Sequence, residues 1–287
     1  MKNITKETGD MAQDHKGQPP IKTRNLLTRV ISALVMLPIA VYIILGGGLA
    51  FFVLIGLLTV IILSEWNGIC ENKAFSLLFL VQAVCSVLLL WQIEWNSPYF
   101  ILSFLCSIVS IVAVSYVIKA KIFWSLFGFL YAFVPSVSFL LISNSSGGEI
   151  VLWMMIVIWS MDTGAYFAGK NIGGPKMSPT ISPNKTWSGL GGGTLTAMVF
   201  GSLYAYYMND KNITLFEDAT ILLILSGLFA ILSQIGDLVE SAVKRKFSVK
   251  DSGAIIPGHG GVMDRVDGVL FVAPAVLVVT YMLYGWG

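Results

Sequence analysis

Long, nearly uncharged apolar stretches recur along most of the chain, and short polar segments separate them. A bilayer core about 30 Å thick requires roughly 20 mostly apolar residues of helix. Within lipid every backbone N–H and C=O needs a partner inside the protein, which favours helices. The pattern therefore predicts an all-α, polytopic integral membrane protein with about nine transmembrane helices. Their approximate ranges are 28–46, 49–65, 74–93, 98–118, 122–143, 150–169, 187–208, 219–241 and 268–286.

The composition agrees with this pattern. Of the 287 residues, 56% are hydrophobic and 12% are Asp, Glu, Lys or Arg. A typical soluble domain contains about 25% charged residues. Too few charges remain to cover a soluble fold, so a soluble enzyme and a disordered chain are both excluded. A nucleic-acid binder that works through a broad basic surface is excluded for the same reason.

The positive charges indicate the orientation of the predicted helices. Cytoplasmic loops of membrane proteins are enriched in Lys and Arg. With a cytoplasmic N-terminus, the nine predicted spans place all but one of the 18 positive charges inside, and the exception is Lys211. We therefore expect a protein of the cell (inner or plasma) membrane whose active site faces the cytoplasm.

The chain divides into three regions by composition. Residues 1–24 are polar and contain Pro19 and Pro20, so they are interpreted as a disordered cytoplasmic tail. Residues 25–145 hold about five predicted helices and little chemistry; the sequence favours an interfacial cap as the role of Glu65. Residues 146–287 hold about four helices, cytoplasmic loops and most candidate functional residues, so they form the predicted catalytic region.

The first candidate residues lie in and after the sixth predicted span. Asp162 lies within that span, and an acidic residue in a membrane is costly unless it is paired, metal-bound or hydrated. It is therefore a functional candidate, with a structural hydrogen bond as the alternative. The following loop, 170–193, contains Lys185, Ser182 and Asn184 just before a predicted helix. Cations and free N–H groups at a helix N-terminus suit a phosphate group, although an ordinary connector is equally compatible.

The second group of candidates lies between residues 235 and 268. Asp237, Glu240 and Lys244 follow helical spacing and share one face, and Asp264 and Asp267 repeat the three-residue spacing at the next helix. Four carboxylates from two helix ends would make a hard-oxygen site suited to Mg²⁺.

Cations surround these acids. The set comprises Lys244, Arg245, Lys246, Lys250 and Arg265. A divalent ion together with cations suits a nucleoside triphosphate. The alternative is that the charges neutralise one another at the membrane surface, which would explain Lys246 and Glu240 but not the whole group. His259, in a Gly-flanked loop, is expected to be accessible.

This region resembles the signature of the phosphatidate cytidylyltransferases, or CDP-diacylglycerol synthases. The matching residues, spread over 241–267, are Ser241, Lys244-Arg245, Lys250-Asp251, His259-Gly260-Gly261 and Asp264-Arg265-Val266-Asp267. Further matches are 162–166, 182–187 and 236–238, so the resemblance covers the C-terminal half. The chain departs from the family at Ser188, where members often have Glu.

The resemblance implies a reaction in phospholipid biosynthesis in which CTP and phosphatidic acid give CDP-diacylglycerol and pyrophosphate, with Mg²⁺ required and a second cation left open. It implies that Asp237, Asp264 and Asp267 are metal ligands and catalytic, with Lys244 also catalytic and Glu240 a further ligand. The implied substrate-binding residues are Ser182, Asn184, Lys185, Lys244, Arg245, Lys250, His259 and Arg265. The partners are CTP, phosphatidic acid and the bilayer, without nucleic acid, and a homodimer is compatible with the resemblance.

Two other functions fit the sequence less well. A related enzyme, such as a lipid kinase acting on a polyprenol or another lipid alcohol, would need a base to deprotonate its hydroxyl substrate. A cation-coupled transporter would use intramembrane acids as an ion path, but it would not need so many cations beside them.

Overall fold

The computed structural model describes residues 37–210, 218–253, 255 and 260–284. The predicted tail, 1–24, lies outside these residues, and so does His259. The first predicted span, 28–46, is described from Leu37, where a helix runs to Gly46.

The rest of the described chain is almost entirely helical. The helices are α2 (Gly48–Glu71), α3 (Leu77–Glu94), α4 (Phe100–Val117), α5 (Ile122–Ser146), α6 (Gly148–Asn171), α7 (Trp187–Asp210), α8 (Ala219–Lys246) and α9 (Met263–Tyr284). Between α6 and α7, β1 (Lys176–Ser178) and β2 (Ser182–Thr186) form an antiparallel hairpin.

The predicted all-α, polytopic class is confirmed. Seven helices among the described residues, α2 to α6 with α8 and α9, are long and apolar enough to cross a membrane. The Gly-rich helix α7 is 24 residues long and occupies the predicted span 187–208. The total of nine spans and the cytoplasmic N-terminus stay predictions.

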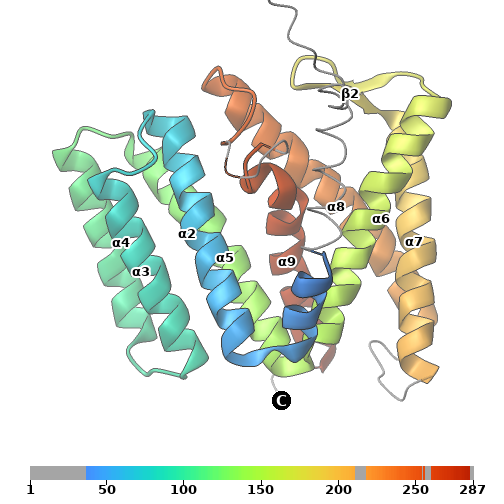
Figure 1. Ribbon diagram of the computed structural model, residues 1–287, viewed down its shortest axis with the longest axis horizontal. Coiled ribbons are helices and arrows are strands. Elements are labelled where there is room, and N and C mark those ends of the chain that lie inside the picture. The colour runs from blue at the N-terminus through green and yellow to red at the C-terminus, as the bar shows by residue number, and fades with distance from the viewer. Residues whose placement is uncertain (1–36, 211–217, 254, 256–259, 285–287) are drawn as a thin grey trace, which may run out of the picture.

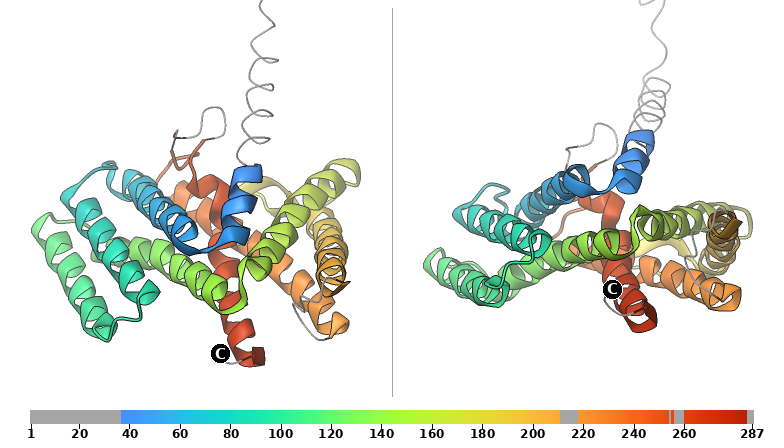
Figure 2. Two further views of the ribbon diagram at one scale, coloured as in Figure 1. Left: turned by 60° about the horizontal axis from the view of Figure 1, so that its bottom comes forward. Right: turned by 90° about the horizontal axis from the view of Figure 1, so that it is seen from below.

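The helices form a bundle with two groups of helices, here called its flanks, on either side of a central pair. α2, α3 and α4 lie on one side of α5 and α9, whereas α6, α7 and α8 lie on the other (Figures 1 and 2). Successive helices alternate in direction, so the last turns of α6 and α8 and the first turns of α7 and α9 reach the same end of the bundle, together with the hairpin. This end, the upper one in Figure 1, is called the hairpin end.

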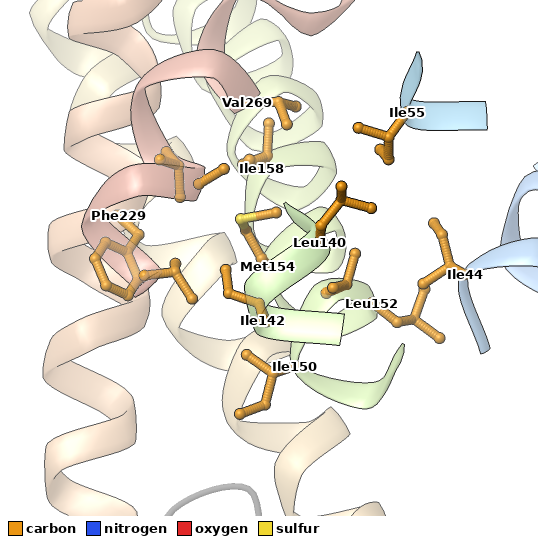
Figure 3. Packing of buried hydrophobic residues seen from close by; sticks show 14 of the residues in the cluster. Ile44, Ile55, Leu140, Ile142, Ile150, Leu152, Met154, Ile158, Phe229 and Val269 are labelled. Atoms are coloured by element: carbon orange, nitrogen blue, oxygen red, sulfur yellow. The ribbon is translucent and has the colours of Figure 1, made fainter. Parts of the chain in front are cut away.

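The centre of the bundle is filled by aliphatic and aromatic side chains from both flanks. Met154 of α6 is fully buried, and it lies among Leu140 of α5, Phe229 of α8, Val269 of α9 and Ile55 of α2 (Figure 3). Because lipid tails are as apolar as these side chains, the helices associate mainly through close van der Waals packing. This core packs α9 against both groups of helices. The packing thereby sets the position of the first turn of α9.

Small residues bring α6 and α7 close together. A β-carbon on Gly193 would lie 2.6 Å from Met161 Sδ and 2.7 Å from the Met161 carbonyl oxygen. Gly164 faces Thr196 in a similarly tight contact. Glycine lets two membrane helices approach at backbone distance, and the approach holds the hairpin between their ends.

The structure differs from the predicted elements mainly at the hairpin end. α9 begins at Met263, five residues before the predicted start, and α2 continues to Glu71. The prediction followed apolar residues, whereas helices extend into charged turns where capping and pairing groups are present. The hairpin was predicted as a loop, since Ser182 to Thr186 lack the alternation of a buried strand.

α8 has a side-chain cap at its other end. The Asp218 side chain accepts a hydrogen bond of 2.7 Å from the Thr220 backbone N–H. This bond favours the ionised form and lowers the pKa of Asp218 below its usual range. The cap marks the start of the helix that carries Asp237, Glu240, Lys244 and Arg245.

We expect Gly193→Ala to destabilise the protein by about 1–3 kcal/mol, because the added methyl group would overlap Met161 in a packed interface. Gly191→Ala is the matched control on the same helix, since a β-carbon there has no neighbour within 4 Å. Thermal unfolding in detergent, followed by intrinsic fluorescence, compares the two variants. Equal unfolding temperatures would show that the α6–α7 contact does not limit stability.

Candidate active site

The elements that carry most of the described candidate residues meet at the hairpin end of the bundle (Figure 1). α6 contributes Asp162, β2 contributes Lys185, α8 contributes Asp237 and Lys244, and the first turn of α9 contributes Asp264. Residues from separate parts of the sequence therefore meet because four elements end here.

The first ion pair joins α8 to α9. Lys244 Nζ lies 2.5 Å from Asp264 Oδ1 and 3.2 Å from Glu240 Oε1. The side chain of Lys244 is 11% exposed, that of Asp264 13% and that of Glu240 0%. The ammonium group of Lys244 therefore contacts two carboxyl groups at a nearly buried site. An unpaired charge at such a site would be energetically costly.

The second ion pair joins the hairpin to α8. Lys185 Nζ lies 2.5 Å from Asp237 Oδ2, and it donates a hydrogen bond of 3.4 Å to the Gln234 carbonyl oxygen. Ser241, one turn further along α8, donates to Asp237 Oδ1 at 3.3 Å. The Asp237 carboxylate is 32% exposed, so it is both held in place and accessible.

A cavity of about 260 Å³ lies beside this second pair. Its polar lining residues are Asp162, Tyr166, Ser182, Asn184, Lys185, Thr186, Gln234 and Asp237. Asp162 is exposed, and its Oδ1 accepts a hydrogen bond of 3.4 Å from Gln234 Nε2. The cavity is near the lower end of the usual size range for small-molecule sites, about 300–1,000 Å³.

Backbone N–H groups also hold Asp264. Ser252 N donates to Asp264 Oδ2 at 3.0 Å, and Gly261 N donates to the same oxygen at 3.1 Å. Both donors lie in the connection between α8 and α9. Asp264 therefore has a fixed orientation, set by Lys244 on one side and by backbone N–H groups on the other.

The remaining candidates are more peripheral. Arg245 is exposed, and its side chain donates to the carbonyl oxygens of Ile181 at 3.4 Å and Val249 at 3.3 Å. Lys250 and Arg265 are exposed.

Two acids and one serine complete the surroundings. Asp267 Oδ1 accepts a hydrogen bond of 2.7 Å from Gly268 N, and the Asp267 carboxyl group interacts with that of Glu240. Ser188, the position at which the chain departs from the family pattern, donates a hydrogen bond to the Gly173 carbonyl oxygen. It thereby ties the start of α7 to the residues before the hairpin.

The predicted metal ligands divide into two places. Asp237 pairs with Lys185, whereas Asp264 and Glu240 pair with Lys244. Within the described ranges, no three His, Cys, Asp or Glu side chains come together in a group that could hold a metal ion. The magnesium site stays a prediction, and its ligands would have to include atoms other than these side chains.

Glu65 is more buried than its sequence interpretation suggested. It is 4% exposed, because α2 continues beyond it and the α8–α9 connection covers it. Its carboxyl oxygens accept hydrogen bonds from Val262 N at 2.8 Å, Met263 N at 2.7 Å and Ser252 Oγ at 2.9 Å. The sequence feature that could have identified Glu65 as a candidate is an acidic residue within a long apolar stretch, which is also the feature that identified Asp162.

Comparison with known proteins places this site in a family. The sequence profile described as "Cytidylyltransferase family" matches residues 27–283, which is most of the chain. The chain belongs to this cytidylyltransferase family. It is 36% identical over 255 residues to the phosphatidate cytidylyltransferase of Brucella suis biovar 1 (strain 1330), covering 87% of this chain and 91% of the relative. It is 33% identical over 257 residues to that of Staphylococcus aureus (strain COL), covering 86% and 95%.

We expect Lys185→Met to lower cytidylyltransferase kcat/KM by about 10- to 100-fold, because hydrogen bonds to charged groups contribute roughly 1.5–3 kcal/mol. The variant removes the cation beside Asp237 and the cavity. Lys176→Met is the control, since Lys176 is an exposed lysine of the same hairpin and is absent from the cavity lining. Initial rates at several CTP concentrations compare the variants, and equal losses in both would argue against a specific role for Lys185.

Proposed function

We propose that this chain is a phosphatidate cytidylyltransferase, which transfers CMP from CTP to phosphatidic acid and produces CDP-diacylglycerol and pyrophosphate. The observation that carries the proposal is a pair of lysine–carboxylate contacts beside a polar cavity at one end of a membrane-helix bundle. The bacterial relatives that share most of its length bear this name, which supports the same conclusion.

The charges at the site suit this reaction. A phosphate oxygen of phosphatidic acid attacks the α-phosphorus of CTP, a new P–O bond forms, and the bond between the α-phosphorus and the bridging oxygen breaks. The attacking oxygen is already anionic near neutral pH, so no strong general base is needed. The main difficulty is the approach of two anions and the release of pyrophosphate, which cations stabilise.

The lysines of the two ion pairs are the proposed cations. Lys185 faces the cavity and Lys244 lies between α8 and α9, so they would neutralise different phosphate groups. Ser182 and Asn184 line the cavity beside Lys185 and would donate hydrogen bonds to the bound substrate. Arg245, Lys250 and Arg265 are exposed at the same end and would attract the anionic substrates. His259, outside the described residues, stays a predicted contact.

The acids at the site fit a magnesium ion by their chemistry. Asp237 and Asp264 each hold an ammonium group at 2.5 Å, so each already stabilises a cation. Mg²⁺ in nucleotide sites is usually held by one or two carboxylates together with substrate phosphates and water. Asp237 and Asp264 are the proposed ligands, with Asp267 and Glu240 as further acids nearby. When bound, Mg²⁺ would stabilise the negative charge on the phosphates and on departing pyrophosphate.

The cellular setting is also part of the proposal. The hairpin end carries Lys185, Lys244, Arg245 and Lys250, and Lys- and Arg-rich ends of membrane helices face the cytoplasm. We therefore place the site on the cytoplasmic face of the cell membrane, where CTP is available. The acyl chains of phosphatidic acid would stay in the bilayer while its headgroup reaches the cavity. A homodimer, which is compatible with the family resemblance, stays an expectation.

Position-specific labelling of CTP tests the reaction. Purified protein with phosphatidic acid, Mg²⁺ and CTP labelled at the α-phosphate should give a labelled lipid, whereas label at the γ-phosphate should appear in pyrophosphate. In a parallel reaction that contains a polyprenol, transfer of the γ-label to its hydroxyl group would instead indicate a lipid kinase. No labelled lipid from either form of CTP would contradict both enzyme functions and favour the transporter.

We expect Asp264→Asn to abolish turnover while the protein stays folded and inserted, because the variant lacks the negative charge that pairs with Lys244 and that would hold a metal ion. Asp218→Asn is the control, since Asp218 is an exposed acid at the opposite end of α8 and Asn can cap the helix equally well. CDP-lipid formation gives the activity, and gel filtration in detergent reports folding. Substantial activity in Asp264→Asn would remove Asp264 from the proposed metal site.

A further inference from the structure

We propose that Glu65 of α2 is a positioning residue that keeps Asp264 aligned by holding the α8–α9 connection in place. The proposal rests on the proposed function, because it assigns a role in the same site to a residue outside the signature region. Among the described residues, the carboxyl oxygens of Glu65 accept hydrogen bonds from Ser252, Val262 and Met263, none of which is a candidate substrate or metal ligand. Glu65 would act through the backbone of Ser252, Val262 and Met263.

The contacts of Glu65 span nearly the whole described chain. Glu65 and Met263 are 198 residues apart, yet Met263 N donates to Glu65 Oε2 at 2.7 Å. Val262 N donates to Oε1 at 2.8 Å, and Ser252 Oγ donates to Oε2 at 2.9 Å. Val262 and Met263 supply N–H groups at the start of α9, where a helix has no backbone acceptors of its own. Glu65 therefore caps α9 from another helix.

Ser252 connects Glu65 to the proposed ligand. Its side chain donates to Glu65, while its backbone N–H donates to Asp264 Oδ2 at 3.0 Å. Gly261, directly before Val262, donates its own N–H to the same oxygen of Asp264 at 3.1 Å. Both backbone groups that orient Asp264 thus lie on, or next to, residues that Glu65 binds.

The backbone of the α8–α9 connection packs tightly against the Glu65 carboxyl group. A β-carbon on Gly261 would lie 2.7 Å from Glu65 Oε2 and 2.8 Å from Oε1, and one on Gly253 would lie 2.8 Å from Oε1. The connection therefore approaches the carboxyl group at backbone distance from two sides. This close fit explains why glycine occupies positions 253 and 261.

A carboxyl group suits this position better than an amide of the same size. Three donors converge on two oxygens, with one on Oε1 and two on Oε2. In Glu65→Gln one oxygen becomes an NH₂ donor, so at least one N–H of the connection would face another donor in either orientation of the amide. The substitution changes hydrogen bonding while it preserves volume, which separates positioning from simple packing.

The test compares Glu65→Gln with Glu71→Gln, a partly buried acid at the end of the same helix that lines a separate pocket with Lys73 and Lys121. We expect Glu65→Gln to lower kcat at least tenfold and to raise the Mg²⁺ concentration for half-maximal rate, with KM for phosphatidic acid within about twofold of wild type. Glu71→Gln should match wild type. Hydrogen exchange should be faster in the peptide containing Val262 and Met263, and unchanged in peptides from α6.

Ser252→Ala gives a graded comparison. It removes one of the three hydrogen bonds to Glu65 and keeps the two backbone bonds, so its loss of kcat should be smaller than that of Glu65→Gln. The double variant should lose less than the product of the two single effects, because both changes break one shared contact.

Three outcomes would overturn the proposal. Wild-type kcat and Mg²⁺ requirement in Glu65→Gln would show that Asp264 does not depend on Glu65. Faster exchange in every helix, with a proportionate loss of folded protein, would assign Glu65 a general stabilising role. If the wild-type protein forms no CDP-lipid at all, the proposed function fails and the positioning role fails with it, whereas an active wild type with an equally active variant overturns the positioning role alone.

Discussion

The structure depends on the pairing of charges at one end of an apolar bundle. A charge that water barely reaches is costly unless an opposite charge and hydrogen bonds accompany it, and this chain keeps few charges. Lys244 with Asp264 joins α8 to α9, and Lys185 with Asp237 joins the hairpin to α8. Each pair therefore fixes two elements and also places a cation and an acid side by side, which is the chemistry that a phosphate-transfer site needs.

The apolar bundle makes this pairing possible. The core around Met154 holds α9 between the two flanks (Figure 3), and the glycine contacts between α6 and α7 bring together the two helices that the hairpin connects. The N-terminal helices take part as well, because Glu65 on α2 binds the start of α9. The N-terminal helices, which hold few candidate functional residues, thus help to position the C-terminal region that holds most of them.

The sequence predicted features that depend on interactions between residues close together in the chain. Apolar run length predicted the long helices, and the spacing of Asp237, Glu240 and Lys244 correctly placed them on one helix. It could not assign partners: nothing near Lys185 in the sequence points to Asp237, and nothing near Glu65 points to Met263. Those contacts depend on how helices pack, and so does the early start of α9. The hairpin was missed because its short strands carry no buried alternating pattern.

The central claim is that the acids at the hairpin end hold a divalent ion together with CTP. Equilibrium binding of a labelled, non-hydrolysable CTP analogue to purified protein in lipid nanodiscs tests it most directly, in Mg²⁺ and in EDTA. The account predicts much tighter binding in Mg²⁺ for the wild-type protein, and no gain from Mg²⁺ in Asp237→Asn. Equal affinity in Mg²⁺ and EDTA, or a full gain from Mg²⁺ in the variant, would contradict it.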